Sequence, residues 1–163
     1  MTSGNVAFDK HAAAHYEAWY ETSEGRRADE LEKAVLGWLL QGFPGSGSAL
    51  EIGCGTGHFS RWLDNQGLAA VGLDLSPAML AKARALGGVP LAQSDARRLP
   101  FADGTFDLTA LVTTLEFLEQ PQDALAEALR VSRRGMLLGV LNYWSVLGLQ
   151  RRLAGLFHQT VYD

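Results

Sequence analysis

The sequence predicts an α/β fold in which a parallel sheet carries helices on both faces. Short apolar stretches alternate with segments of helical spacing from residue 48 onward, which is typical of a doubly wound parallel sheet. The first of these stretches ends at Ile52, and glycines follow it at alternate positions, Gly53, Gly55 and Gly57. Ligands of such sheets bind beyond the carboxyl ends of the strands, so a glycine turn there predicts a binding site.

Composition narrows the class of protein. A chain of 163 residues with 47% apolar and 20% charged residues is typical of one soluble domain. The net charge of −4 argues against nucleic acid as a partner. The most apolar stretch, Met136 to Leu149, is too short to span a bilayer, and the N-terminus does not resemble a signal peptide. We therefore expect a cytoplasmic protein without a membrane span, and its oligomeric state stays open.

Two helices are expected before the sheet, at Phe8–Tyr20 and Gly25–Leu40. The apolar face of the second is assigned to Leu31, Val35, Trp38 and Leu39. Turn-forming residues from 42 to 47 then separate two parts of the chain. These parts are an N-terminal helical cap, residues 1–45, and an α/β domain, residues 46–163.

Strands and helices alternate in the second part. We expect strands at Ser48–Gly53, Ala69–Asp74, Val89–Gln93, Phe106–Val112 and Gly135–Leu141. We expect helices at His58–Gln66, Pro77–Leu86, Gln120–Ser132 and Val146–Phe157. Proline is favoured in the first turn of a helix, which supports the start at Pro77.

The glycine turn reads Glu51-x-Gly53-x-Gly55-x-Gly57. Glycine tolerates positive φ and lets a ligand approach the backbone closely, and the following helix offers N–H groups at its N-terminus. The spacing is neither that of a dinucleotide loop nor that of a P-loop. Cys54, the single cysteine, is interpreted as a small space-filling residue and not as a nucleophile.

An acid at the end of the second strand, Asp74, is expected to accept hydrogen bonds from the two ribose hydroxyls of a nucleoside. Its alternative role is to cap the helix at Pro77, although Ser76 is the better-placed cap. NAD-dependent enzymes also place an acid at about this spacing. Asp74 therefore supports an adenosine ligand without choosing the cofactor.

A resemblance makes that choice. The motif from Glu51 to Gly57, the acid Asp95, the Leu99-Pro100-Phe101 turn and the segment Asp103-Gly104-Thr105-Phe106-Asp107 resemble class I S-adenosylmethionine-dependent methyltransferases. The likeness covers residues 48–141 and is to the small-molecule branch that includes ubiquinone and menaquinone biosynthesis enzymes. It implies a Rossmann-like fold, S-adenosylmethionine as cofactor, S-adenosylhomocysteine as product and a small-molecule methyl acceptor.

The resemblance also implies roles for single residues. Asp95 would accept a hydrogen bond from the adenine amino group, and the N–H of Ala96 would reach a ring nitrogen. Met79 would contact adenine or belong to the core. Glu51 would help to place the cofactor's ammonium group, and Tyr16 of the cap would fold over the cofactor. The residues expected to bind the cofactor are Tyr16, Glu51, Gly53, Cys54, Gly55, Gly57, Asp74, Leu75, Met79, Asp95, Ala96 and Thr113.

Methyl transfer needs little acid–base chemistry, and the sequence contains no Ser-His-Asp set and no cluster with metal-ligand spacing. No catalytic residue is assigned. Two alternatives remain, a non-catalytic S-adenosylmethionine-binding protein and an NAD-dependent oxidoreductase. The chain also ends after the helix that follows strand five, whereas the family's sheet has seven strands. We therefore expect either a fragment of a longer protein or an exposed fifth strand, and the fragment is favoured because an uncovered apolar edge promotes aggregation.

Overall fold

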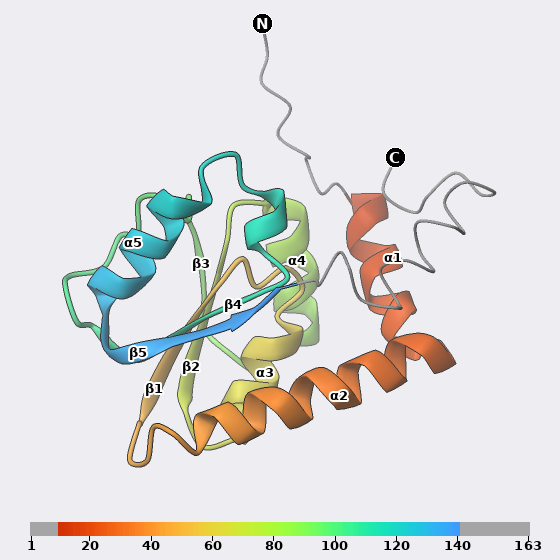
Figure 1. Ribbon diagram of the computed structural model, residues 1–163. Coiled ribbons are helices and arrows are strands. Elements are labelled where there is room, and N and C mark those ends of the chain that lie inside the picture. The colour runs from red at the N-terminus through yellow and green to blue at the C-terminus, as the bar shows by residue number, and fades with distance from the viewer. Residues whose placement is uncertain (1–9, 141–163) are drawn as a thin grey trace, which may run out of the picture.

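The computed structural model describes residues 10–140, with side chains from His15 onward. Its strands form one sheet in the order β3-β2-β1-β4-β5, and all neighbouring strands are parallel (Figure 1). The strands are β1 (Ser48–Ile52), β2 (Ala69–Asp74), β3 (Leu91–Gln93), β4 (Phe106–Val112) and β5 (Ser132–Gly139). The expected α/β fold is confirmed, and the strand order reverses between β1 and β4, where ligands of such sheets bind.

Within residues 10–140, five α-helices accompany the sheet. They are α1 (Lys10–Glu21), α2 (Ser23–Leu40), α3 (His58–Asn65), α4 (Pro77–Leu86) and α5 (Pro121–Val131), and a short 3-10 helix, η1 (Leu115–Phe117), follows β4. The expected helix at Val146–Phe157 lies outside the described residues. Within the described part of the chain, no helix combines the length and apolar character needed to cross a bilayer.

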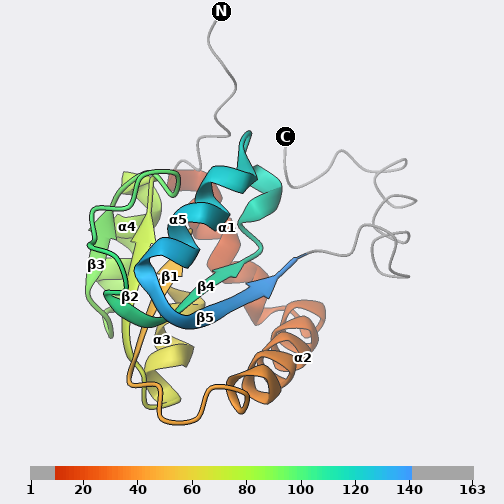
Figure 2. The ribbon, with the colours of Figure 1, turned by 60° about the vertical axis from the view of Figure 1, so that its left-hand side comes forward.

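Helices cover both faces of the sheet. On one face, Leu36 of α2 and Phe59 and Leu63 of α3 pack into a core with residues of β1, β2, β4 and β5. On the other, Ala124 and Ala128 of α5 pack against β1, β2 and β4. Figure 2 shows α5 above the sheet and α2 and α3 below it. This arrangement holds the carboxyl ends of β1, β2 and β4 at one edge, beside α1.

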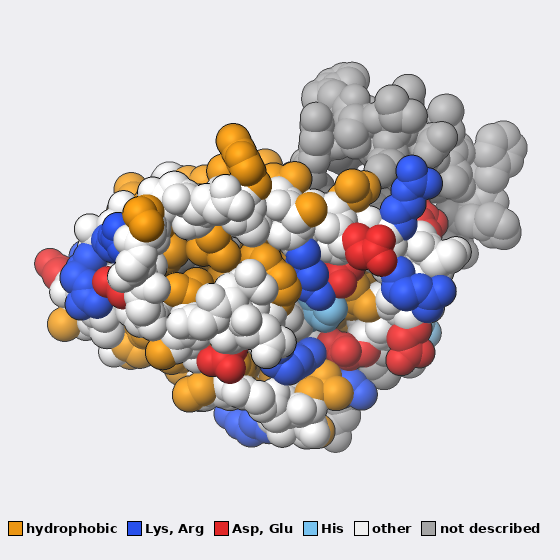
Figure 3. Space-filling view, turned by 90° about the horizontal axis from the view of Figure 1, so that it is seen from below, with side chains coloured by type: hydrophobic (Ala, Val, Ile, Leu, Met, Phe, Trp, Pro, Cys, Tyr) orange, Lys and Arg blue, Asp and Glu red, His pale blue; other side chains and the backbone are white. Residues whose placement is uncertain are grey.

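The predicted apolar face of α2 is largely wrong. Leu31, Val35 and Trp38 are 57%, 58% and 69% exposed, whereas Leu36 is 4% exposed. The helix carries two apolar stripes, and the stripe with Leu36 and Leu39 faces the sheet. Leu31 and Val35 instead border a hollow of about 320 Å³ between α2 and the ends of β4 and β5. Figure 3, a view from below, shows hydrophobic side chains among the charged ones on this side.

Strand β5 starts three residues before the predicted start, directly after α5. In the described part of the sheet it pairs with β4 alone. Its first residues are polar because Arg133 binds Asp107 at the start of β4, with Nη2 2.8 Å from Oδ1. The other oxygen of Asp107 accepts hydrogen bonds from the backbone N–H groups of Gly47 (2.7 Å) and Ser48 (3.1 Å). Asp107 thus joins the amino ends of three strands, away from the glycine turn.

The hydrogen bonds and the ion pair of Asp107 predict that the protein loses stability in acid. The Gly47 N–H and the Arg133 guanidinium lower the pKa of Asp107 from 3.8 to about 2. The folded protein therefore holds fewer protons here than the unfolded chain, so this stabilisation is complete above pH 3.8 and is lost as the pH falls toward 2. The free energy of unfolding, measured in urea by circular dichroism, should fall less steeply toward low pH for Asp107→Asn than for the wild type. The exposed control Asp64→Asn should keep the wild-type slope, and a wild-type slope in Asp107→Asn would contradict the assignment.

Candidate cofactor site

The glycine turn continues β1 across the edge of the sheet. Gly53, Gly55 and Gly57 have φ values of 76°, 54° and 79°, in the left-handed region that favours glycine. The N–H of Gly53 donates to the carbonyl of Leu73 at 2.7 Å, which ties the turn to β2. A Cβ atom on Gly53 would lie 2.3 Å from the side chain of Thr114, so only glycine fits there.

Gly55 is the middle glycine of the turn and lies beside side chains of two other elements. It is half-buried, while its neighbours Cys54 and Thr56 are buried. A Cβ atom on Gly55 would lie 3.9 Å from Cε1 of Tyr16 and 4.0 Å from Sδ of Met79. Two side chains predicted to contact the cofactor therefore lie beside Gly55, and one of them, Met79, is 3% exposed.

Asp74 lies at the tip of β2 and binds the glycine turn directly. Its Oδ2 accepts a hydrogen bond from the N–H of Gly55 at 2.8 Å, and its Oδ1 accepts one from the N–H of Ser76 at 2.8 Å. Ser76 is the N-cap of α4, as expected, because its Oγ accepts from the N–H of Met79 at 3.2 Å. Burial raises the pKa of Asp74, and backbone hydrogen bonds from Ser76, Gly55 and Leu75 oppose the shift. A carboxylate has about four lone-pair sites, so Asp74 keeps capacity for a further donor.

Glu51 lies behind the turn and is 2% exposed. It accepts a hydrogen bond from the hydroxyl of Ser60 in the first turn of α3, a helix whose N-cap residue, Gly57, has no side chain to cap it. Burial raises the pKa of Glu51 from 4.5 to about 8, although the hydrogen bonds from Ser60 oppose the shift. Glu51 is therefore mostly protonated at neutral pH.

The end of β4 contains a strained residue. Among residues 10–140, Thr113 is the one residue other than glycine whose φ, 51°, lies in the left-handed region. Its N–H donates to the carbonyl of Gly139 at 2.7 Å, and it lines the hollow beside α2. Such strain costs about 1–3 kcal/mol and is concentrated at functional sites. The next residue, Thr114, was not predicted; its Oγ1 donates to the carbonyl of Ile52 at 3.2 Å and so joins β4 to the glycine turn.

Asp95 follows β3 and lies near the surface. Its Oδ1 accepts a hydrogen bond from the N–H of Arg97 at 2.9 Å, and its Oδ2 pairs with Nη2 of Arg97 at 2.7 Å. The Arg97 side chain lowers the pKa of Asp95, which stays ionised. The adjacent Ala96 is buried. The expected adenine acceptor is thus present as a carboxylate in a tight turn.

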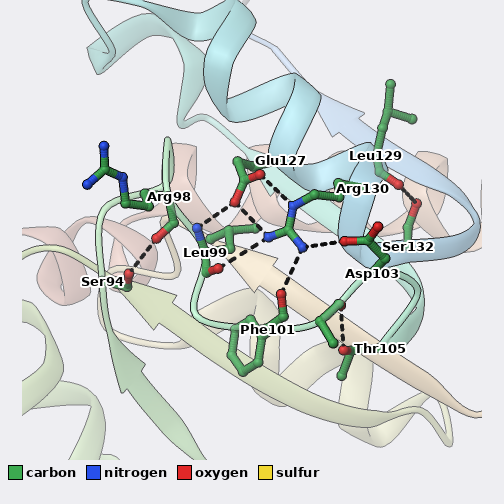
Figure 4. Close-up of polar contacts among 11 residues, drawn as sticks. Ser94, Arg98, Leu99, Phe101, Asp103, Thr105, Glu127, Leu129, Arg130 and Ser132 are labelled. Atoms are coloured by element: carbon green, nitrogen blue, oxygen red, sulfur yellow. Dashed lines mark hydrogen bonds and ion pairs between the residues drawn. The ribbon is translucent and has the colours of Figure 1, made fainter.

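An acid–base pair of α5 holds the loop after this turn (Figure 4). Nε and Nη2 of Arg130 bind the two carboxylate oxygens of Glu127 at 2.6 and 2.8 Å. Nη1 of Arg130 donates to the carbonyl of Phe101 at 2.9 Å and to Asp103 at 2.8 Å, and Glu127 accepts from the N–H of Leu99 at 2.7 Å. Arg130 lowers the pKa of Glu127 to about 2. The sequence pattern does not indicate this role, because Glu-x-x-Arg on a helix also fits an ordinary surface ion pair.

The remaining predicted residues differ in exposure. Cys54 is 4% exposed, and burial raises the pKa of its thiol, so the thiol stays protonated. Leu75, directly after Asp74, is 48% exposed and leaves an apolar side chain at the open edge of the sheet.

Comparison with known proteins decides the family. A family model described as "Methyltransferase domain" matches residues 50–139, from β1 to the end of β5. The chain belongs to this methyltransferase family. MJ1123 of Methanocaldococcus jannaschii is 34% identical over 143 residues, which are 86% of this chain and 64% of that protein.

Two further relatives of this methyltransferase domain carry descriptive names. The ubiquinone/menaquinone biosynthesis C-methyltransferase UbiE of Roseobacter denitrificans is 37% identical over 122 residues, 69% of this chain and 48% of that protein. A structure of a SAM-dependent methyltransferase from Thermotoga maritima superposes with a TM-score of 0.72 at 28% identity and covers 91% of this chain and 68% of that chain. The chain thus spans 64% and 48% of the lengths of these two sequence relatives. S-adenosylmethionine is the cofactor that the family implies, and the glycine turn with Asp74 at the tip of β2 is the set of residues that would hold it.

Proposed function

We propose that this domain transfers the methyl group of S-adenosylmethionine in line to a small-molecule acceptor. The observation that carries the proposal is the half-buried Gly55 of the glycine turn, which has a positive φ, lies between Tyr16 and Met79 and donates its N–H to Asp74. The bound cofactor supplies an electrophilic methyl group on sulfur. The chain's own task is to hold that group and the acceptor in line, because alignment alone lowers such barriers substantially.

Each half of the cofactor has candidate partners in this site. The spare lone pairs of Asp74 suit the ribose hydroxyls, and the Asp95 carboxylate with the Ala96 N–H suits the edge of adenine. Leu75 offers an exposed apolar surface beside the tip of β2. The methionine half would then extend toward Thr113, at the end of β4.

The hollow beside α2 suits the acceptor. Its volume of about 320 Å³ falls at the lower end of the roughly 300–1,000 Å³ range of small-molecule pockets. Leu31, Val35 and Val112 supply an apolar lining, and Thr113, at the end of β4, also lines the hollow. The proposed acceptor therefore has an apolar body and a nucleophilic atom that reaches the end of β4.

Product formation tests the proposal. The chain is incubated with S-adenosylmethionine and a panel of apolar-bodied phenols, amines and enols, and S-adenosylhomocysteine is quantified by mass spectrometry. Formation that depends on one acceptor, with a methylated product, supports methyl transfer. Cofactor binding without product from any acceptor would instead support a non-catalytic binding protein.

The buried carboxyl of Glu51 predicts proton release on cofactor binding. Since its pKa is about 8, Glu51 is mostly protonated at pH 7, and a nearby ammonium group favours the charged carboxylate and lowers that pKa. Calorimetric titration with S-adenosylhomocysteine at pH 7, in two buffers of different ionisation enthalpy, should show release of a fraction of a proton. Glu51→Gln should bind more weakly and without that release. Equal proton release by both proteins would place the ammonium group away from Glu51.

The same pKa also bears on stability without ligand. The folded protein holds a proton on Glu51 that the unfolded chain loses between pH 4.5 and 8, so this group destabilises the fold as the pH rises through that window. Glu51→Gln, which cannot ionise, should therefore lose less stability than the wild type between pH 5 and 9 in the same urea assay. Parallel curves for the two proteins would contradict the assigned pKa.

A further inference from the structure

A side chain of the N-terminal cap binds the glycine turn from the side opposite β2. Glu17 of α1 accepts a hydrogen bond, through Oε1, from the hydroxyl of Thr56. Thr56 is fully buried and stands between Gly55 and Gly57. Arg61 of α3 completes the cluster, because its Nη1 donates to the carbonyl of Thr56 at 2.8 Å and its Nη2 lies 3.8 Å from Glu17.

This contact affects both the turn and an aromatic neighbour. Glycines leave a backbone with many accessible conformations, so a side-chain tether at Thr56 restricts the φ and ψ angles of the two glycines beside it. The same helix carries Tyr16, whose Cε1 atom would lie 3.9 Å from a Cβ atom on Gly55. Glu17 therefore fixes the shape of the turn and the position of an aromatic side chain above it.

The cap has a second, separate attachment. Nε2 of His58, the first residue of α3, lies 2.7 Å from Oδ1 of Asp29 in α2. The ring of Tyr20 stacks on His58 with centroids 3.9 Å apart and an interplanar angle of 13°. Because these contacts do not involve Glu17, removal of its carboxylate leaves the cap attached to α3.

We propose that Glu17 is a positioning residue for the cofactor, which couples the seating of α1 to the conformation of the glycine turn through Thr56. This assignment rests on the proposed function. Coupling between two parts of a site is reciprocal, so ligand binding at the turn stabilises the seating of α1 as well. The chain thus uses its cap as part of the cofactor site and not as a passive cover.

A double-mutant cycle on Glu17 and Thr56 tests the proposal. Glu17→Ala and Thr56→Val should each weaken S-adenosylhomocysteine binding about tenfold, the usual effect of one hydrogen bond to a charged group. The double variant should bind no more weakly than either single one, because both substitutions break the same contact. Glu17→Gln, which keeps an acceptor for Thr56, should stay within about threefold of the wild type. The matched control is Glu21→Ala, an exposed acid on the same helix, and it should bind like the wild type.

Hydrogen exchange separates positioning from general destabilisation. Without ligand, Glu17→Ala should speed amide exchange at residues 53–57 and leave β4 and α5 as protected as in the wild type. Ligand should protect α1 in the wild type and protect it less in the variant. Unchanged affinity of Glu17→Ala, or additive losses in the double variant, would overturn the assignment. A wild-type chain that binds no S-adenosylhomocysteine would instead overturn the proposed function, and this assignment with it.

Discussion

Gly55→Val is expected to abolish S-adenosylhomocysteine binding, with no heat in a calorimetric titration. Gly55 has a φ of 54°, which a β-branched residue adopts only under strain. The new side chain would also occupy the space between Tyr16 and Met79, each about 4 Å from the added Cβ atom. Both effects act where the cofactor would meet the backbone.

A second glycine separates these two effects. Gly67, after α3, has a φ of 86°, and a Cβ atom there would have nothing within 4 Å. Gly67→Val therefore imposes comparable backbone strain away from the turn. It should lower the unfolding midpoint and leave affinity unchanged. Wild-type affinity in a folded Gly55→Val protein would show that the turn is not the site.

Asp74→Asn is expected to weaken S-adenosylhomocysteine binding by about 1.5–3 kcal/mol, the range for a lost hydrogen bond to a charged group. The amide nitrogen of asparagine cannot accept a hydrogen bond, whereas both carboxylate oxygens already accept backbone N–H groups, from Gly55 and Ser76. One of these backbone donors and one ribose hydroxyl would lose their acceptor. Calorimetry gives the affinity, and thermal unfolding gives the accompanying loss of stability.

Two ligands test whether the affinity lost in Asp74→Asn comes from the ribose hydroxyls. The wild type should bind the 2′-deoxyribose analogue of S-adenosylhomocysteine less tightly than the parent compound, and Asp74→Asn should discriminate less between the two. Asp64→Asn, on the exposed side of α3, should behave like the wild type toward both. Equal discrimination by Asp74→Asn and the wild type would place the ribose elsewhere.

Elements with clear start and stop signals could be predicted from the sequence. Ala69–Asp74, Phe106–Val112 and Pro77–Leu86 were expected at the residues where the structure has them. Pro77 and the Ser76 cap define the start of α4, and β4 is rich in apolar residues, with a buried apolar run from Ala110 to Val112 at its end. The glycine turn was found for the same reason, since positive φ and close approach both require glycine.

Features that depend on distant parts of the chain could not be predicted. Helix α2 has two apolar stripes, one with Leu31 and Val35 and one with Leu36, and both have helical spacing. Only the position of α2 on the sheet determines which stripe is buried. Likewise, Glu17 and Thr56 are 39 positions apart, and no local pattern indicates their contact. The predicted start of β5 was wrong because its first residues are polar. Arg133, one of these residues, binds Asp107 on a different strand, and the local sequence does not indicate that contact.

Parallel calorimetric titrations of the chain with S-adenosylhomocysteine and with NAD test the central claim most directly. The site predicts micromolar, one-to-one binding of S-adenosylhomocysteine and no heat with NAD, because Gly53, Gly55 and Gly57 lack the spacing of a dinucleotide loop. Binding of NAD alone would contradict the cofactor assignment. Binding of neither compound would show that residues 1–163 do not by themselves form the proposed site.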